Sequence, residues 1–249
     1  MAIDNVKNIL LVSSAKGGVG KSTITANIAS ALHLQGQKVG VVDCDIYGPS
    51  QNKMFGITES PENPHDPVES HGILVNSIAN RIGSGQTIAW RGPMLKIAVM
   101  DLILDTSWNE LDYLVVDMPP GTGDIQLSIC EKLTDSKAVI VTTPQDVATI
   151  DTERGVDLFQ KSGISLTGVV ENMSGFVCRH CGEIEHIFGQ GGGQKIADKY
   201  DMKFLGEIPI ETNIREQGDK GKPIAFDSDS VISDLYMKIV KQILDESDT

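Results

Sequence analysis

The sequence predicts a three-layer α/β fold, in which a mostly parallel central sheet is flanked by helices. Short apolar runs alternate with segments of helical periodicity along the 249 residues, 40% of which are hydrophobic. Aromatic residues make up 5% of the chain and glycine occurs 25 times, which suits an α/β domain with several special loops better than an all-β sandwich. We find no repeat, low-complexity tract or linker, so residues 1–249 are expected to form a single domain.

The expected strands are short and rich in Val, Ile and Leu, as parallel strands covered on both faces tend to be. They are Asn8 to Ser13, Lys38 to Val42, Tyr113 to Val116, Ala138 to Thr142 and Leu166 to Val170. A helix is expected from Lys21 to Gln35, where apolar residues recur at helical spacing, and Gly36 follows as a C-cap. A C-terminal helix with apolar residues from Val231 to Ile243 is expected to pack on the sheet.

Two segments interrupt this alternation. Residues 58–72 are rich in Pro, Glu, Asn and His, and residues 174–193 contain two cysteines and six glycines. Both are expected to be long surface excursions from the domain.

Charge and hydropathy exclude several classes of protein. With 21 Lys and Arg against 34 Asp and Glu, the net charge of -13 would repel a nucleic-acid backbone, so no nucleic-acid partner is expected. No run of 18 apolar residues exists and the N-terminus lacks the layout of a secretory signal, so we expect no membrane association and a cytoplasmic location. The four cysteines are too few and too unevenly spaced to stabilise the domain through disulfide bonds, so we expect their thiols to be reduced.

The segment SSAKGGVGKST lies between the first expected strand and the first expected helix. Its glycines allow backbone N–H groups to surround an anion at a helix N-terminus, Lys21 adds a positive charge, and Ser22 offers a hydroxyl to Mg²⁺. Ala15 departs from the strict GxxxxGK[ST] pattern, and a second lysine, Lys16, stands inside the loop. The segment predicts binding of a nucleoside triphosphate through Lys16, Gly17, Gly18, Val19, Gly20, Lys21, Ser22 and Thr23.

This KGGVGKS arrangement resembles the deviant-Walker branch of P-loop NTPases, which includes nitrogenase iron protein, ArsA, MinD and ParA. The resemblance implies a P-loop NTPase fold and a homodimer that sandwiches two ATP molecules. It also implies that Lys16 reaches the partner subunit's nucleotide and neutralises charge on the transferred phosphoryl group, as an arginine finger does. The alternative, a glycine-rich turn with two solvated lysines, is disfavoured by the strand and helix on either side.

Acidic residues follow two expected strands at the edge of the sheet where ligands gather. We expect Asp117 to be the Walker B carboxylate, which holds Mg²⁺ directly or through water, and Asp45 to orient the attacking water. Lys16, Lys21 and Asp45 are therefore the expected catalytic residues. Whether Asp43 or Asp45 activates water stays open. The alternative role for these aspartates, and for Asp43 in particular, is to stabilise a turn or cap a helix.

Cys178 and Cys181 stand two residues apart in a glycine-flanked loop. Two soft ligands suit zinc or an iron–sulfur cluster, and both usually need four. Two such loops meeting on the axis of a dimer would supply four thiolates for one [4Fe-4S] cluster. Alternatively, His180 and His186 could complete a zinc site within one chain, or the pair could be a redox dithiol. The motif alone favours cluster and zinc equally.

Further motifs resemble the Mrp/ApbC branch of iron–sulfur cluster carriers. They are Asp43 to Ser50, Arg91 to Met94, Met118 to Asp124, Thr142 to Gln145, Glu171 to Phe176 and Phe188 to Gly193. The match implies that the Gly121 N–H contacts the γ-phosphate, that Asn172 reads the adenine edge, and that the segment after Pro209 completes the base pocket. It also implies a weak ATPase that takes a bridging [4Fe-4S] cluster from a cluster donor to recipient apoproteins.

Two other functions remain open at this point. One is a MinD/ParA-like positioning ATPase that binds lipid or DNA, against which the negative charge and the CxxC loop argue. The other is an ATPase in which the CxxC pair holds a structural zinc that is never transferred.

Overall fold

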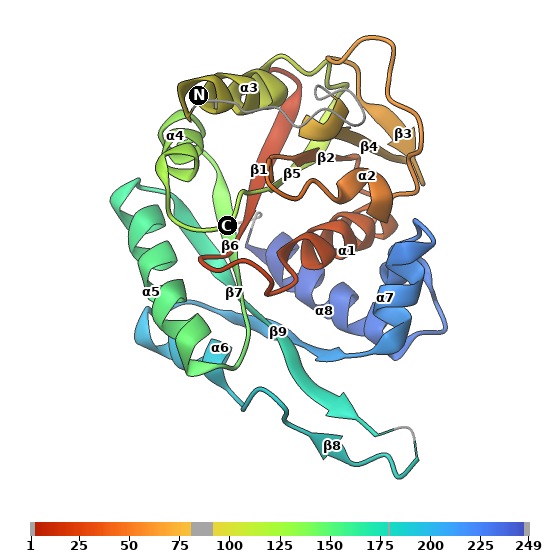
Figure 1. Cartoon of the computed structure of the whole chain (residues 1–249), viewed down its shortest axis with the longest axis vertical. Helices are drawn as coiled ribbons and strands as arrows, with labels where there is room; N and C mark the ends of the chain where they lie inside the picture. Colours follow the sequence, from red (N-terminus) through yellow and green to blue (C-terminus); the bar gives the residue numbers. More distant parts are fainter. Residues whose placement is uncertain (1–2, 81–91, 179, 247–249) are drawn as a thin grey trace.

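A mostly parallel sheet forms the centre of the protein and carries helices on both faces (Figure 1). The computed structural model describes residues 3–80, 92–178 and 180–246; two residues of the motifs above, Arg91 and Arg179, lie outside these ranges. Within them the strand order is β3-β4-β2-β5-β1-β6-β7-β8, and β9 also pairs with β7. The β3–β4 and β7–β8 pairs are antiparallel, and the other pairs are parallel. The expected α/β class is confirmed.

The expected strands all form, with ends shifted by a few residues. The strands are β1 (Val6–Ser13), β2 (Val39–Asp43), β3 (Val68–Ser70), β4 (Ile73–Ser77), β5 (Leu111–Asp117), β6 (Lys137–Thr142), β7 (Ser165–Val177), β8 (Ile184–Glu185) and β9 (Phe204–Ile210). The expectation for β7 was too short, because this strand continues beyond Val170 through polar and glycine residues to Val177. The excursion at 58–72 contains β3, and that at 174–193 contains β8, so each includes an edge strand.

The helices alternate with the strands along the chain. They are α1 (Lys21–Leu34), α2 (Gln51–Met54), α3 (Gly92–Leu104), α4 (Asp124–Lys132), α5 (Asp146–Lys161), α6 (Gly192–Lys199), α7 (Thr212–Asp219) and α8 (Val231–Asp245), with 3₁₀ turns at Ile78–Asn80 and Ile224–Phe226. The helix α1 ends at Leu34, one residue earlier than expected, and its C-cap is Gln35 instead of Gly36. Gly36 follows with a left-handed φ of 85°, as is common directly after a C-cap. Within the described residues, no helix is long and apolar enough to cross a membrane.

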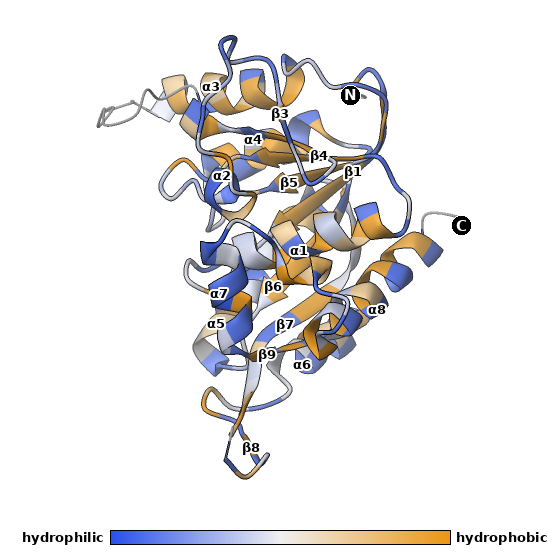
Figure 2. Ribbon diagram, turned by 90° about the vertical axis from the view of Figure 1, so that its right-hand side faces the viewer, coloured by the Kyte–Doolittle hydropathy of each residue, from blue (hydrophilic) through white to orange (hydrophobic). Residues whose placement is uncertain are grey.

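Two hydrophobic cores lie on the two faces of the sheet, and hydrophobic residues colour much of the strands and parts of the helices (Figure 2). Neighbouring residues of β1 contribute to opposite cores, because Leu10 packs with α1 and α8 while Leu11 packs with α3, α4 and α5. The C-terminal helix therefore packs on the sheet, as expected, through Tyr236, Ile239, Val240 and Ile243. This packing fixes β1, β2 and β5, whose carboxyl ends position the site described next.

Candidate functional site

The loop of residues 14–20 connects the carboxyl end of β1 to α1. Gly18 and Gly20 have φ values of 82° and 83°, in the left-handed region that favours glycine. Space also requires glycine at position 20, because a Cβ atom there would lie 2.1 Å from Asn172 Nδ2. Asn172 Nδ2 donates to the Val19 carbonyl at 2.8 Å and so ties the loop to β7. The loop thus turns through two glycines at the N-terminus of α1, a position where free backbone N–H groups favour an anion.

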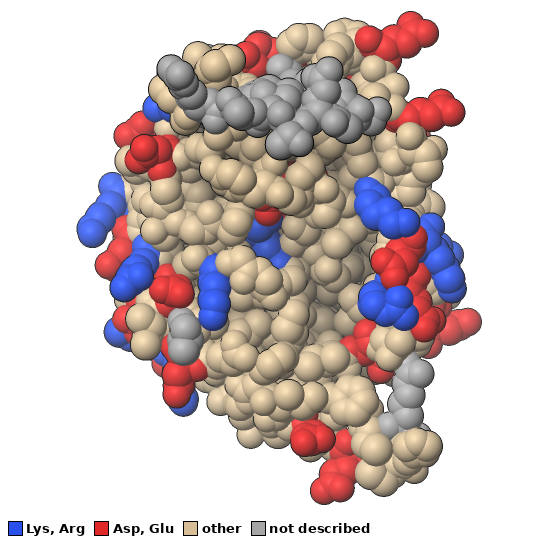
Figure 3. All heavy atoms as spheres, in the orientation of Figure 1, with Lys and Arg blue, Asp and Glu red and all other residues tan. Residues whose placement is uncertain are grey.

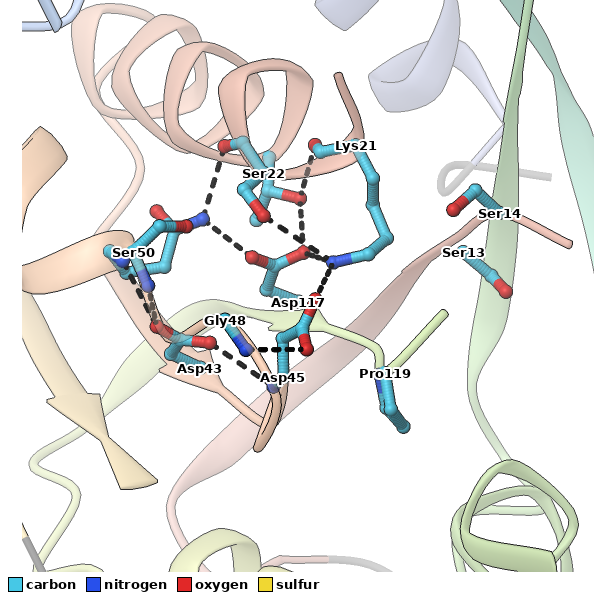
Figure 4. A network of polar contacts seen from close by, with 12 residues as sticks. Ser13, Ser14, Lys21, Ser22, Asp43, Asp45, Gly48, Ser50, Asp117 and Pro119 are labelled. Atoms are coloured by element: carbon cyan, nitrogen blue, oxygen red, sulfur yellow. Dashed lines mark hydrogen bonds and ion pairs between the residues drawn. The ribbon is translucent and has the colours of Figure 1, made fainter. Parts of the chain in front are cut away.

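The amine of Lys21 lies at the centre of a group of oxygen atoms (Figure 4). It forms a buried ion pair with Asp117, lies 3.6 Å from Asp45 Oδ2, and contacts Ser22 Oγ at 3.4 Å. Burial opposes the charge of Lys21, but the Asp117 carboxylate outweighs burial, and the net effect raises the pKa of Lys21. A charged amine is therefore held beside the loop of residues 14–20.

Asp117 is the last residue of β5 and is fully buried. Besides the ion pair with Lys21, its Oδ1 accepts a hydrogen bond from Thr25 Oγ1 at 3.1 Å. Its Oδ2 accepts from Gln51 Nε2 at 2.7 Å. Both carboxylate oxygens thus have protein partners, and their positions are fixed by three surrounding side chains.

Asp43 has a different environment, although it stands beside Asp117 in the neighbouring strand. Its Oδ2 accepts from the backbone N–H groups of Ser50 and Gln51 at 2.8 and 2.9 Å and from Ser77 Oγ at 3.2 Å, and its Oδ1 accepts from the Asp45 N–H at 3.1 Å. Burial and the nearby Asp117 raise the pKa of Asp43 to about 7, while the N–H groups act in the opposite direction. These contacts hold the loop of residues 44–50 on the sheet.

Lys16 and Gly121 lie on the loops that border the site. The side chain of Lys16 is half-buried, and its carbonyl accepts from Ser14 Oγ at 3.0 Å. Gly121 has a φ of 95°, and its N–H donates to the Ser14 carbonyl at 3.1 Å. The loop after β5 therefore lies against the phosphate-binding loop. The face that carries these loops has charged side chains along its flanks and a largely uncharged middle (Figure 3).

An apolar cavity of about 520 Å³ opens beside the start of α1. Its lining includes Thr23, Asn172, Pro209, Ile214 and Pro223. The structure therefore brings Asn172 and the segment after Pro209 to one cavity next to the loop. The size and apolar lining suit a flat aromatic ring system.

Cys178 and Cys181 lie at the end of the β7–β8 hairpin, which extends away from the body of the protein (Figures 1 and 2). We call residues 176–185 the cysteine hairpin. Its tip is closed by two backbone hydrogen bonds of 2.8 Å, from Gly182 N–H to the Cys178 carbonyl and from Cys178 N–H to the Glu183 carbonyl. The backbone N–H groups of Cys181 and His180 hold the pKa of Cys178 below its usual value. This turn favours the thiolate, which is the metal-binding form of cysteine.

The other candidate ligands lie elsewhere. His186 Nδ1 hydrogen-bonds to the Ser174 carbonyl at 2.8 Å, near the base of the hairpin. Cys44 and Cys130 are fully buried in the hydrophobic core, and burial raises the pKa of both, that of Cys130 to about 12. In the part of the chain that the structure describes, no three His, Cys, Asp or Glu side chains gather as a metal-binding group. Cys178 and Cys181 thus form a pair of thiols without further ligands from these residues.

Comparison with known proteins places the chain in a family. A family sequence model described as "ParA: NUBPL iron-transfer P-loop NTPase" matches residues 5–244. The chain belongs to this family. This NUBPL-family chain is 49% identical over 242 residues to an iron-sulfur cluster carrier protein of Pseudomonas fragi, covering 94% of this chain and 84% of that protein. It is 45% identical over 247 residues to an iron-sulfur cluster carrier protein of Escherichia coli K12, covering 97% and 67%.

Solved structures agree with the fold of this NUBPL-family chain. A nucleotide-binding protein from Archaeoglobus fulgidus, in complex with ADP, superposes with a TM-score of 0.77 at 34% identity and covers 91% of each chain. The cell division ATPase MinD from Pyrococcus furiosus superposes with a TM-score of 0.71 at 21% identity over 96% of this chain and 99% of that one. At that identity the MinD likeness shows the fold alone. The expected P-loop NTPase fold and family resemblance are confirmed.

Two residues of the phosphate site in this NUBPL-family chain were not predicted. Thr25 contacts Asp117 from the first turns of α1, and its position four residues after Lys21 is a periodicity that could have indicated it. Gln51 contacts Asp117 and the Ser22 carbonyl, across 66 and 29 residues of sequence. No local pattern marks Gln51, because its contacts exist only after β2, β5 and α1 have assembled.

Proposed function

We propose that this chain is a homodimeric ATP-binding protein that slowly hydrolyses ATP, binds a [4Fe-4S] cluster between two subunits and transfers it to apoproteins. The observation that carries this proposal is the presence, in one chain, of a buried Lys21–Asp117 pair beside a glycine-rich loop and of a thiol pair whose turn favours the thiolate. The names of the relatives, iron-sulfur cluster carrier proteins, support the second half of the proposal.

The nucleotide would bind with its phosphates on the loop of residues 14–20 and its base in the apolar cavity beside Asn172. Lys21 would move from Asp117 to the phosphates, a short displacement for a flexible side chain that already lies 3.4 Å from Ser22 Oγ. The N–H of Gly121, now bonded to Ser14, would turn to the γ-phosphate. These residues bind and orient the phosphate chain.

The residues at the site fit a magnesium ion. Ser22 Oγ and the Asp117 carboxylate are hard oxygen donors, which Mg²⁺ prefers, and both lie within the contact sphere of the Lys21 amine. When bound, Mg²⁺ would neutralise charge on the phosphates of ATP. Protein groups already contact both oxygens of Asp117. We therefore infer that this carboxylate would bind the ion through a water molecule instead of directly.

We assign to Asp45 the role of orienting the attacking water. Its side chain is 14% exposed, and its Oδ1 accepts a hydrogen bond from the Gly48 N–H at 3.2 Å. Asp43 is fully buried and its oxygens are engaged by the loop of residues 44–50, so it has a structural role. Lys16 would act on the nucleotide of the partner subunit, where the largely uncharged middle of this face permits close approach of a second copy.

The iron–sulfur cluster is the group that the protein would carry and transfer. Cys178 and Cys181 supply two thiolates per subunit, and two hairpins together supply the four that a [4Fe-4S] cluster takes. Cys181 is exposed at the tip of the hairpin, so ligands from a cluster donor or a recipient apoprotein can reach it. An exposed site of this kind suits a cluster that is passed on.

Anaerobic reconstitution with iron and sulfide tests this proposal. The wild-type protein should gain a broad absorption band near ~400 nm and about four irons per dimer. Cys178→Ala should lose both, while Cys130→Ala should retain them and both variants should bind ATP as the wild type does. Full cluster occupancy in both Cys178→Ala and Cys181→Ala would contradict the proposal, and a colourless protein with one zinc per chain would establish the structural-zinc alternative.

A further inference from the structure

Gln51, the first residue of α2, contains a buried oxygen atom that has no partner. The side chain is fully buried, and its Nε2 donates to the Ser22 carbonyl at 3.0 Å and to Asp117 Oδ2 at 2.7 Å. Both contacts are acceptors, which identifies the nitrogen end of the amide. Its Oε1 is then buried without a hydrogen-bond partner among the described residues.

Such an oxygen atom indicates a missing donor. Buried polar groups in proteins are nearly always hydrogen-bonded to protein, to ordered water or to a ligand. The neighbouring Ser50 Oγ is also buried and without a partner in the described part of the chain. The Gln51 amide that carries the first of these atoms contacts Asp117 and the backbone of Ser22, the two residues assigned to the magnesium ion. A hydrated cation placed there would supply O–H donors, whereas the phosphates of a nucleotide would supply only acceptors.

We propose that Gln51 is a positioning residue of the magnesium site, whose Oε1 accepts a hydrogen bond from a water bound to the ion while Nε2 holds Asp117 and α1 in register. The inference rests on the proposed function, since it assumes that ATP binds with Mg²⁺. It adds a residue, and a link between β5 and α1, to a site otherwise formed by the loop and the strand ends.

The charge of the site supports a neutral residue at this position. When Lys21 moves to the phosphates, Asp117 keeps the hydrogen bonds from Thr25 and Gln51 as its protein contacts. An amide N–H fixes the Asp117 carboxylate without neutralising it, so the carboxylate still attracts a cation. A cationic side chain in place of Gln51 would compete with the ion, and a carboxylate would repel Asp117.

The variants that test this proposal are Gln51→Met, which keeps the volume and removes both polar ends, and Gln51→Ala. Asn52→Ala is the matched control, because Asn52 is the next residue of α2 and donates to Asn80 instead. Each protein is tested for nucleotide binding by calorimetry in EDTA, for Mn²⁺ binding in the presence of ADP by electron paramagnetic resonance, and for the Mg²⁺ concentration that half-saturates ATP hydrolysis.

Both Gln51 variants should weaken Mn²⁺ binding and raise the half-saturating Mg²⁺ concentration by about tenfold, the loss expected for one hydrogen bond near a charged group. Binding of ADP in EDTA should weaken much less than Mn²⁺ binding, and the ADP binding that remains also shows that the variants fold. Wild-type metal dependence in both variants would overturn the inference, and so would an equal loss of ADP binding in EDTA, which would indicate a structural role alone. A wild-type protein that binds no nucleotide under either condition would overturn the proposed function as well.

Discussion

The phosphate site is buried and held by many contacts, whereas the cysteine hairpin is exposed and held by few. At the phosphate site, Asp117 is fully buried, and Lys21, Thr25 and Gln51 surround it. On the hairpin, the strand pairing of β8 involves two residues, and Cys181 is exposed. Among the described residues, several side chains thus surround the Asp117 carboxylate, whereas the hairpin brings together two thiols and no further metal-binding side chain.

This difference has a physical reason. A charged group taken out of water must be paired and hydrogen-bonded, so the phosphate site has to be assembled by the core of the fold. A thiol pair that receives and releases metal must instead stay accessible. Substitutions at the phosphate site should therefore change the stability of the fold as well as nucleotide binding, whereas substitutions on the hairpin should change metal binding alone.

The largest effect on stability is expected from Asp117→Ala. This change leaves the Lys21 amine, 5% exposed, in a buried position without its closest carboxylate, and removal of one partner from a buried pair costs about 3 to 5 kcal/mol. Urea unfolding measures the loss. Asp117→Asn, which keeps the shape and one oxygen, is the matched variant and should lose less. An unchanged free energy of unfolding for Asp117→Ala would contradict the view that this buried pair contributes to the stability of the fold.

A smaller loss is expected from Gly20→Ala. The left-handed φ of 83° costs an L-residue about 1 to 2 kcal/mol. The added Cβ would also displace Asn172, so ADP binding should weaken together with stability. Gly17→Ala is the control, since a Cβ there meets nothing within 4 Å. Equal calorimetric affinities for ADP in the two variants would contradict the role given to the contact between Gly20 and Asn172.

No loss of stability is expected from Cys178→Ala, whose urea midpoint should match that of the wild type. The hairpin should instead be distinguished by the reactivity of its thiols. Because the pKa of Cys178 is lowered, its thiolate fraction should rise at a lower pH than that of a free cysteine, and alkylation should be rapid near neutral pH. Cys130, buried with a pKa raised to about 12, should stay unlabelled in the folded protein.

Mass spectrometry after a pulse of iodoacetamide at several pH values checks this ordering. Labelling of Cys44 or Cys130 as fast as that of Cys178 would show that the two classes of thiol do not differ as the structure indicates.

The same contrast separates what the sequence could predict from what it could not. The loop of residues 14–20 and the aspartates at the ends of β2 and β5 are local patterns, and the structure brings Lys21, Asp45 and Asp117 together. The strand β9 was missed because Gly206 and Pro209 interrupt its apolar run, and its strand state comes from pairing with β7. Gln51 was missed for a similar reason, because tertiary contacts alone place it at the site.

The central claim, that two subunits share one cluster through their hairpins, is tested most directly by native mass spectrometry of the anaerobically reconstituted protein. The account predicts a dimer that carries one cluster of about four irons and four sulfides, and dissociation of the dimer when the cluster is removed in the absence of ATP. A monomer that retains a full cluster of its own would contradict it.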